Sequence, residues 1–380
     1  MIEAGAFIQA AREQGFGLYA GVPCSYLKPF INYVIDSDQL RYIGAANEGD
    51  AVAIAAGSSL GGQGAVAMFQ NSGLGNAVNP LTSLTWTFRI PILVITTLRG
   101  EPGGVPDEPQ HELMGQITTR MLETMEIPWS WFPTEAGQIE DVLATAEKHM
   151  REQQRPYALV MRKGSVAPAK LRSAAAAREP IIRDAERAAP SARREAMLRA
   201  VQAAAGPADL LVATTGYTGR ELYACGDHAN QIYMVGSMGC APTFGLGLAA
   251  AQPARRVIVL DGDGAALMRL GALATLGYER PENLLHILLD NGIHESTGGQ
   301  ATVSRSIDFV SIAAACGYPR CELAATPDAL RAQVEDRSPG LRFVHSPIEP
   351  GIAADLPRPT QKPPEVAERL RAELARGAGV

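Results

Sequence analysis

The sequence predicts an α/β protein of two domains, each a mostly parallel sheet with helices on both faces. Short β-branched apolar runs alternate with Ala-rich helical stretches, and this alternation occurs in two sets separated by a charged segment. Strand–helix alternation is typical of parallel sheets covered by helices. With 380 residues, of which 46% are hydrophobic, the chain is long enough to form two cores of ordinary size.

The first set of apolar runs predicts a domain over residues 1–168. Its helices are expected near 2–14, 49–60, 76–87 and 136–152. Its strands are expected near 17–21, 41–45, 65–69, 92–96 and 158–161.

Residues 169–190 are charged and rich in Ala, and they are expected to form a linker because they carry no strand pattern. A second domain is expected over 191–347, where Ser191 is a typical N-cap for a helix that runs to residue 205. Residues 348–380 are expected to be an extended Pro-rich tail that ends in a helix near 364–376. The strands of the second domain are expected near 210–214, 231–235, 257–261, 285–289 and 341–345.

Composition argues against several partners. The net charge is −6 and no block of Lys and Arg stands out, which disfavours nucleic acid and anionic membranes. No run of about 18 apolar residues predicts a membrane span, and the N-terminal stretch is not expected to be a signal peptide. Five cysteines without a CxxC pair disfavour zinc and indicate reduced thiols in a cytoplasmic protein.

Two carboxylates stand between glycines where the expected strand at 257–261 ends, in VIVLDGDGAALM. An unpaired buried charge is costly, so these carboxylates need a partner. Asn291 ends the next apolar run, and 26 residues separate it from Gly264. Adjacent parallel strands would bring Asp263 and Asn291 together at the carboxyl edge of the sheet, where open α/β sheets bind ligands. Carboxylate, amide and carbonyl oxygens suit Mg²⁺ completed by phosphate oxygens; otherwise Asp263 caps the helix and Asn291 makes a turn.

The GDG…N spacing resembles the fingerprint of thiamin diphosphate enzymes. Longer strings resemble the phosphonopyruvate decarboxylase family, namely GVPCSYLKP, ANEGDAVAIAAG, QNSGLGNAVNPLTSL, RGEPGGVPDEPQHELMG, GSMG and HESTGGQATVS. The resemblance implies a pyrimidine-binding domain followed by a diphosphate-binding domain, with thiamin diphosphate and Mg²⁺ as cofactors. It implies decarboxylation of 3-phosphonopyruvate to phosphonoacetaldehyde and CO₂ in phosphonate or antibiotic biosynthesis. It also implies self-association, with the active site at the subunit interface.

Glu48 lies where an expected strand gives way to an expected helix. In thiamin diphosphate enzymes a Glu so placed contacts N1′ of the pyrimidine ring, and the resemblance therefore implies that Glu48 is a catalytic acid. The plainer alternative is a first-turn acid favoured by the helix dipole. Asp50 is expected to be a solvated charge at the start of the same helix.

The resemblance implies a metal shell of Asp263, Asn291 and the Ile293 carbonyl, with Asp261 and Asp290 orienting the turns. Met238 is expected to support the bend between the two cofactor rings, although a core Met is the alternative. Ordinary turns and helix caps are the alternatives for most other cofactor contacts. The full set of expected cofactor-binding residues is Glu48, Gln70, Asn71, Thr215, Gly216, Thr218, Ser237, Met238, Gly262, Asp263, Gly264, Ala265 and Asn291.

A phosphonate needs basic groups and backbone donors. Candidates for substrate binding are Ser25, Lys28, Arg99 and His111, and candidates for catalysis beside Glu48 are His111 and His294. The alternative for Lys28 and Arg99 is a solvated loop charge, which is the more common role of such residues. The family resemblance suggests an acidic residue where this chain has Cys24, and a thiol does not relay protons as a carboxylate does at neutral pH.

Two other functions remain open at this point. One is decarboxylation of sulfopyruvate or another small 2-oxo acid, since a sulfonate and a phosphonate differ by charge and the sequence does not rank their affinities. The other is a non-catalytic diphosphate-binding regulator, which would not need Glu48. A dinucleotide-dependent dehydrogenase is disfavoured because no GxGxxG follows the first expected strand.

Overall fold

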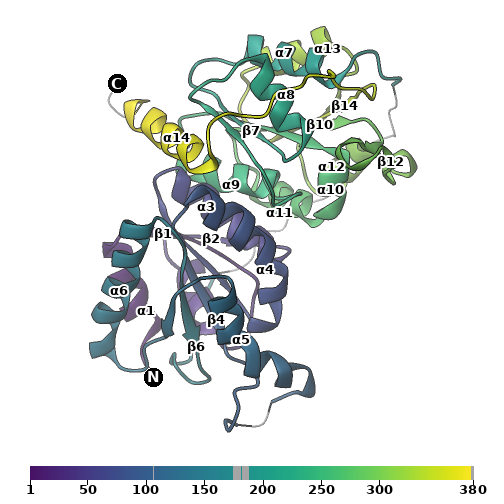
Figure 1. Ribbon diagram of the computed structural model, residues 1–380. Coiled ribbons are helices and arrows are strands. Elements are labelled where there is room, and N and C mark those ends of the chain that lie inside the picture. Colours follow the sequence, from purple (N-terminus) through teal and green to yellow (C-terminus); the bar gives the residue numbers. More distant parts are fainter. Residues whose placement is uncertain (106, 174–180, 182–187, 378–380) are drawn as a thin grey trace. The chain divides into compact units, whose positions relative to one another are not determined.

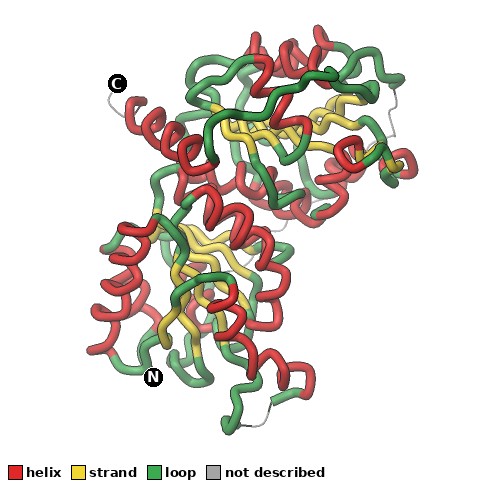
Figure 2. Tube along the Cα trace, in the orientation of Figure 1, coloured by secondary structure: helices red, strands yellow, loops and turns green. Residues whose placement is uncertain are grey.

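A computed structural model describes residues 1–105, 107–173, 181 and 188–377. The chain divides into two compact units, Met1–Ala176 (unit 1) and Ala177–Val380 (unit 2). Figure 2 shows one parallel sheet in each unit, with helices on both of its faces. The division falls inside the expected linker, most of which lies outside the described residues.

Unit 1 contains a six-stranded parallel sheet. Its strands lie side by side in the order β2-β1-β3-β4-β6-β5. Their bounds are β1 (Phe16–Gly21), β2 (Arg41–Gly44), β3 (Gly64–Phe69), β4 (Leu93–Thr97), β5 (Trp129–Trp131) and β6 (Tyr157–Met161). Except at the edges, the strands are almost fully buried apolar runs, as expected when helices cover both faces.

Helices cover both faces of this sheet. They are α1 (Ala4–Glu13), α2 (Lys28–Ile35), α3 (Glu48–Leu60), α4 (Leu74–Pro80), α5 (Glu112–Thr124) and α6 (Ile139–Gln153). Figure 1 shows α1 and α6 on one face and α3 and α4 on the other. Under α1, the rings of Phe7 and Phe132 stack with centroids 4.7 Å apart, and Phe30 packs against both. These aromatic contacts anchor α1 and α2 to the sheet.

Unit 2 repeats this plan. Its strands lie in the order β13-β14-β10-β9-β7-β8, all parallel. Their bounds are β7 (Leu210–Ala213), β8 (Gln231–Tyr233), β9 (Val257–Gly262), β10 (Leu284–Asp290), β13 (Arg320–Leu323) and β14 (Arg342–Pro347). Read from β8 to β13, the order matches that of unit 1 from β2 to β5, strand for strand in chain order.

The helices of unit 2 again lie on both faces of the sheet. In Figure 1, α7, α8 and α13 lie on one face and α9, α11 and α12 on the other. The bounds are α7 (Arg194–Ala204), α8 (Tyr217–Cys225), α9 (Ala241–Ala251), α10 (Asp263–Met268), α11 (Gly271–Glu279), α12 (Phe309–Ala315), α13 (Pro327–Glu335) and α14 (Pro363–Gly377). A short antiparallel hairpin, β11 (Ile293–His294) with β12 (Gln300–Ala301), follows β10.

The structure differs from the expected elements in several places. Edge strands β5 and β13 and helices α2 and α5 were not expected, because their apolar patterns are short or mixed with polar residues. The helix expected at 76–87 divides at Pro80 into α4 and a π-helical turn, Leu81–Trp86, since proline has no N–H to continue the ladder. Ser191 is not the N-cap of α7: that helix starts at Arg194, and the Ser191 hydroxyl donates to the Ala325 carbonyl.

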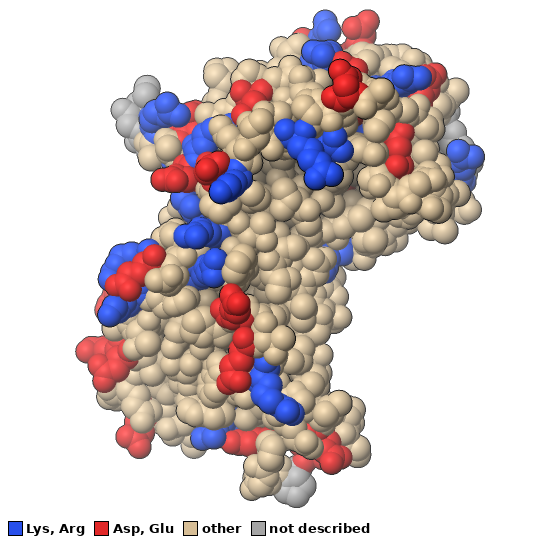
Figure 3. Space-filling model, in the orientation of Figure 1, with Lys and Arg blue, Asp and Glu red and all other residues tan. Residues whose placement is uncertain are grey.

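Two further features are the distribution of charged residues on the surface and the length and apolar character of the helices. Figure 3 shows Lys and Arg interspersed with Asp and Glu on the face that it presents. None of the described helices combines the length and the apolar character that crossing a membrane requires.

Candidate active site

The carboxyl ends of β9 and β10 bring the predicted metal ligands to the same edge of unit 2. Leu289 of β10 pairs with Gly262 of β9, so the residues that follow, Asp263 and Asn291, leave neighbouring strands at nearly the same level. A pocket opens at this edge. The predicted residues that line it are Thr215, Gly216, Thr218, Met238, Gly262, Asp263, Gly264, Ala265, Asn291, Ile293 and His294.

Asp263 is almost completely buried, with 4% of its surface exposed. One carboxylate oxygen, Oδ2, accepts a hydrogen bond from the Thr302 hydroxyl at 2.5 Å. Burial raises the pKa of Asp263, and the hydrogen bond from Thr302 opposes that rise. A buried carboxylate in this setting would gain stability from a nearby cation.

Asn291 and the two outer carboxylates shape the turns. The Asn291 side chain accepts from the Ile293 N–H (3.1 Å) through Oδ1 and donates to Glu295 (3.1 Å) through Nδ2. Asp261 accepts from the Gly262 N–H at 2.9 Å, and Asp290 accepts from the Gly292 N–H at 3.0 Å. These hydrogen bonds fit the predicted role of Asp261 and Asp290 in orienting the turns.

The opposite wall of the pocket is the turn between β7 and α8. Gly216 adopts φ +96°, which favours glycine, and directly precedes α8. The first N–H groups of a nine-residue helix such as α8 have no partners within the helix. The buried Thr214 hydroxyl has no hydrogen-bond partner within the described part of the chain. These donors suit phosphate oxygens.

The residues present fit a diphosphate with a divalent cation. Unpaired donors line one wall, and the other carries a buried carboxylate beside an amide oxygen. Among the described residues, no cluster of three or more His, Cys, Asp and Glu side chains forms a metal site made only of such groups. The expected shell needs only one carboxylate, because diphosphate oxygens and water complete an Mg²⁺ octahedron.

Met238 lines the pocket from a strained turn after β8. Ser237 has φ +52°, a left-handed conformation that non-glycine residues seldom adopt, and such outliers are concentrated at ligand sites. Ser237 itself is 2% exposed and does not line the pocket. His294 and Met238 both approach Gly264 closely, because a Cβ there would lie 2.7 Å from the His294 ring and 3.3 Å from the Met238 methyl. Gly264 thus makes room for both side chains.

In unit 1, Glu48 is the first residue of α3, behind the N-cap Asn47. Its Oε2 accepts a hydrogen bond from Asn76 at 2.8 Å. A Cβ on Gly73 would lie 2.1 Å from Oε1, so the carboxylate position depends on a glycine there. Asp50 is not a solvated charge: it is 1% exposed, because α3 is buried almost all around its axis.

Gln70 and Asn71, the two polar residues after β3, differ in how far their side chains are free to contact a ligand. Asn71 is fully buried, and its amide joins the backbone N–H and C=O of Arg99 to the Thr118 hydroxyl. This arrangement braces two strand ends and does not support the predicted cofactor contact. Gln70 is partly exposed; its side chain accepts from the Cys24 thiol (3.4 Å) and donates to the Ser72 hydroxyl (2.6 Å).

Arg99 lies in a cluster with Asp107, Tyr26 and Ser25. Its guanidinium donates to both oxygens of Asp107, lies over the Tyr26 ring and reaches the Ser25 hydroxyl at 3.4 Å. The hydrogen bonds from Arg99 hold the pKa of Asp107 well below its usual range. Arg99 is therefore already paired with a carboxylate, which was not anticipated for a phosphonate ligand.

The other substrate candidates occupy different settings. Lys28, the first residue of α2, is exposed and lines a cavity together with Ser25, Lys163 and Lys170. His111 is 6% exposed, and its buried Nδ1 has no hydrogen-bond partner among the described residues. Buried polar groups are nearly always hydrogen-bonded, so this nitrogen is a candidate for a bond to a ligand.

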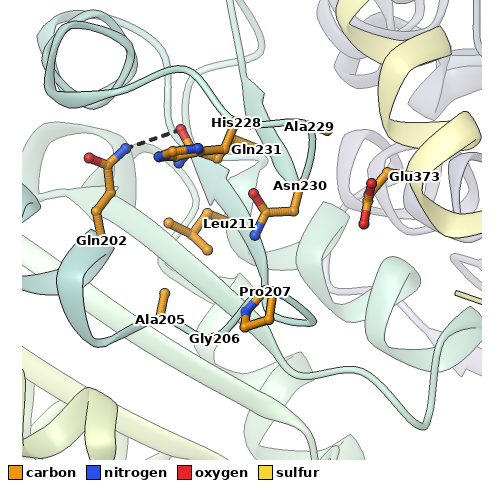
Figure 4. A pocket seen from close by; sticks show the side chains of 10 residues that line it. All are labelled: Gln202, Ala205, Gly206, Pro207, Leu211, His228, Ala229, Asn230, Gln231 and Glu373. Carbon is orange, nitrogen blue, oxygen red and sulfur yellow. Dashed lines mark hydrogen bonds between the residues drawn. The ribbon is translucent and has the colours of Figure 1, made fainter.

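A further pocket of unit 2, shown in Figure 4, lies at the opposite end of the sheet, where β7 and β8 begin. Its amides serve the fold. Gln202 donates to Gly226, to Leu222 and to the side chain of Gln231, and Asn230 donates to the Asp209 carbonyl. Ligands of open α/β sheets bind at the carboxyl ends of strands, so this pocket is not the candidate site.

Several residues of the strand-end pocket escaped the sequence analysis. They are Arg194, Thr214, Leu289, Glu295 and Ser296, whereas Tyr217 lies inside the predicted turn 215–218. Thr214 precedes that turn and Glu295 follows the predicted His294, so proximity to the motifs was the available signal. Arg194 starts α7, distant in sequence, and had none.

Family models match both units. The description "Thiamine pyrophosphate enzyme, N-terminal TPP binding domain" fits residues 3–118, and "Thiamine pyrophosphate enzyme, C-terminal TPP binding domain" fits residues 216–344. Among solved structures, benzoylformate decarboxylase from Polynucleobacter necessarius is similar with a TM-score of 0.72. The match covers 93% of this chain and all of the other, at 12% identity, and shows the shared fold.

Curated relatives match over nearly the whole chain. Phosphonopyruvate decarboxylase of Streptomyces viridochromogenes is 44% identical over 98% of this chain and 95% of its own length. Sulfopyruvate decarboxylase of Methanosarcina acetivorans is 31% identical over 97% of this chain and 96% of its own length.

Proposed function

Because this chain belongs to the phosphonopyruvate decarboxylase family of thiamine pyrophosphate enzymes, we propose that it decarboxylates 3-phosphonopyruvate to phosphonoacetaldehyde and CO₂. The observation that carries the proposal is the edge of unit 2 where Asp263 and Asn291 meet beside unpaired donors, which fits a magnesium diphosphate. The proposed setting is phosphonate biosynthesis in the cytoplasm, where loss of CO₂ would make this step irreversible.

On the diphosphate side, Asp263, Asn291 and the Ile293 carbonyl would hold Mg²⁺. The hydroxyls of Thr214, Thr215 and Thr218 would meet the phosphate oxygens. Met238 would support the cofactor from the turn after β8. These roles need rigid presentation, and the residues stand at strand ends and on short turns of a buried sheet.

Thiamin diphosphate, when bound, supplies the electron sink for loss of CO₂ from a 2-oxo acid. Glu48 would hold a proton at a ring nitrogen, while Asn76 fixes its other carboxylate oxygen. His111 and His294 are the proposed proton donors to the product, since imidazole is a common acid and base in catalysis.

We place the phosphonate with Ser25 and Lys28, which line one cavity of unit 1. Lys28 is exposed, whereas Arg99 is already paired with Asp107. Arg99 would then act by holding Ser25, to which it donates a hydrogen bond. Gln70, beside Cys24, is the proposed neighbour of the pyrimidine ring.

The test removes and restores the cofactors. Protein dialysed against a chelator should release no CO₂ from phosphonopyruvate until Mg²⁺ and thiamin diphosphate are both returned. With both present, kcat/KM for phosphonopyruvate should exceed that for sulfopyruvate. The opposite preference would assign the chain to sulfopyruvate, which the 31% identical relative makes the second candidate.

The substitution Glu48→Gln tests whether the chain is an enzyme or a non-catalytic regulator with the same fold. This variant should bind the cofactors as the unchanged chain does and lose about 10²–10⁴-fold in kcat, as expected for general acid–base catalysis. Full decarboxylation by the variant would contradict the role of Glu48.

We also propose that the chain self-associates and that unit 1 of one copy completes the site on unit 2 of another. Large apolar side chains stand exposed around the carboxyl edge of unit 2, namely Val235, Met268 and Val303. Mixing Glu48→Gln chains with Asp263→Ala chains tests this. Shared sites would regain activity, because half of the sites in a mixed dimer carry neither change, whereas sites within single chains would stay inactive.

A further inference from the structure

The hairpin that follows β10 returns the chain to the edge of the sheet. β11 and β12 pair antiparallel, with Ile293 opposite Ala301 and His294 opposite Gln300. The Thr302 N–H then donates to the Gly292 carbonyl at 3.0 Å. Thr302 therefore lies at the open end of the hairpin, and Glu295 begins the loop that joins its two strands. Both residues contact a predicted metal ligand.

Thr302 holds the carboxylate of Asp263. The Thr302 hydroxyl lies 2.5 Å from Asp263 Oδ2, and both residues are more than nine-tenths buried. Its oxygen also lies 3.0 Å from the Ser304 hydroxyl, which in turn donates to Asp290. Since a carboxylate has no proton to give, the Thr302 proton points to Asp263 and fixes the rotation of that side chain.

Glu295 holds the amide of Asn291. Its Oε2 accepts from Asn291 Nδ2 at 3.1 Å and from Arg194 at 2.5 Å, and its Oε1 accepts from the Gly351 N–H. An ionised carboxylate only accepts hydrogen bonds, so the NH₂ end of Asn291 must face Glu295. The amide oxygen, which is the end a hard cation prefers, then faces away from Glu295.

The charges around Glu295 leave the site short of positive charge. Arg194, 7% exposed, lies between Glu221 and Glu295 and pairs with both carboxylates. One guanidinium thus serves two carboxylates, and Asp263 adds a further negative charge to the pocket that Arg194 and Glu295 line. A bound divalent cation would balance this excess.

We propose that Glu295 and Thr302 are positioning residues that orient the two side-chain ligands of the metal, Asn291 and Asp263. The proposal rests on the proposed function only in needing a magnesium diphosphate at this edge. Groups that orient metal ligands typically change metal affinity by about 10–100-fold when removed. The same loss is expected here, and it appears as a raised Mg²⁺ requirement.

The test measures cofactor binding directly, by calorimetric titration of thiamin diphosphate into the full-length protein at increasing Mg²⁺. Thr302→Val, which keeps the shape and removes the hydroxyl, should raise half-saturating Mg²⁺ by about 10–100-fold. Thr302→Ser should restore the value of the unchanged chain. Glu295→Gln should shift it in the same direction, and the urea midpoint of each variant shows whether the fold is intact.

Thr297→Val is the matched control, because Thr297 is exposed and bonds only within the hairpin, to His294 and Gln300. It should leave half-saturating Mg²⁺ unchanged. An unchanged Mg²⁺ requirement in folded Thr302→Val would overturn the proposal, and so would binding of the cofactor by the unchanged chain without Mg²⁺. A chain that binds magnesium thiamin diphosphate but leaves phosphonopyruvate intact would instead contradict the proposed function.

Discussion

The two units follow the same path with different residues at the corresponding strand ends. In each unit the third and fourth strands in chain order are neighbours, β3 with β4 and β9 with β10. After β3 and β4 stand Asn71 and Arg99, which bond to each other and close the gap between the strands. After β9 and β10 stand Asp263 and Asn291, which line an open pocket.

This difference shows that the same sheet topology can serve either stability or binding. Which of the two it serves depends on the residues at the carboxyl ends of its strands. In unit 1 the Asn71 amide bonds to the Arg99 backbone at the end of the neighbouring strand, so these two strand ends are joined directly. In unit 2 the side chains bond to the hairpin behind them, which leaves the pocket open. The contrast predicts that equivalent substitutions harm binding in unit 2 and stability in unit 1.

The largest effect is expected from Asp263→Ala. Removing the only carboxylate of the proposed metal shell should abolish Mg²⁺-dependent binding of thiamin diphosphate, a loss greater than the about 10–100-fold expected for an orienting group. Calorimetry measures it. Asp328→Ala is the control, because Asp328 also stands in the first turn of a helix, α13, but is exposed. Normal cofactor binding by Asp263→Ala would refute the site.

Gly73→Ala should act on catalysis and spare the fold. The new methyl group would lie 2.1 Å from Glu48 Oε1, and the flexible Glu48 side chain can move away. Displacing a catalytic group by about 1 Å can cost about 10²-fold in rate, so kcat should fall by that order. Gly75→Ala is the matched control, since a Cβ there meets no neighbouring atom. Equal kcat in both variants would mean that the position of Glu48 does not matter.

Asn71→Ala should reduce stability. It leaves the backbone N–H and C=O of Arg99 without their side-chain partner inside unit 1, which costs about 1–3 kcal/mol in free energy of unfolding. The three tryptophans, Trp86, Trp129 and Trp131, all lie in unit 1, so their fluorescence during urea unfolding reports that unit alone.

The exposed Asn79→Ala is the control for this measurement and should change the unfolding free energy by less than about 0.5 kcal/mol. A shift of similar size in both variants would argue against the brace.

The smallest effect is expected from the pH dependence of the Arg99–Asp107 pair. Hydrogen bonds from Arg99 lower the pKa of Asp107 in the folded chain. The pair therefore stabilises unit 1 above the unfolded pKa of about 4, and its contribution is lost as the pH falls through the lower folded value. Asp107→Asn should cost about 1 kcal/mol at pH 6 and less at pH 3, by tryptophan fluorescence. A difference that grows on acidification would contradict this assignment.

Much of the fold was predictable because central strands such as β3, β4, β9 and β10 are continuous apolar runs. Edge strands were not, since β13, with the sequence RCEL, carries two charges and packs only on one side. The ends of β9 and β10 were predictable because their spacing along the chain places them on neighbouring strands. Asp50 was misjudged because its burial depends on how α3 packs, which a local pattern does not reveal.

Contacts between residues that are far apart in the sequence were the hardest to predict. Thr302 reaches Asp263 across 39 positions, and Arg194 reaches Glu295 across 101. Asn71 looked like a ligand because its position after a strand resembles that of a binding residue. Only the structure shows that the Arg99 backbone satisfies its amide.

The strand order that the two units share also bears on how many cofactor molecules one chain binds. A polypeptide with two sheets of the same strand order offers two corresponding edges, but just the later one carries the carboxylate and amide pair at the third and fourth strands. The expected binding stoichiometry is therefore one thiamin cofactor per polypeptide, whatever the number of copies in the assembly. Under the proposed function, the corresponding edge of the earlier sheet would instead contact the reacting end of the cofactor.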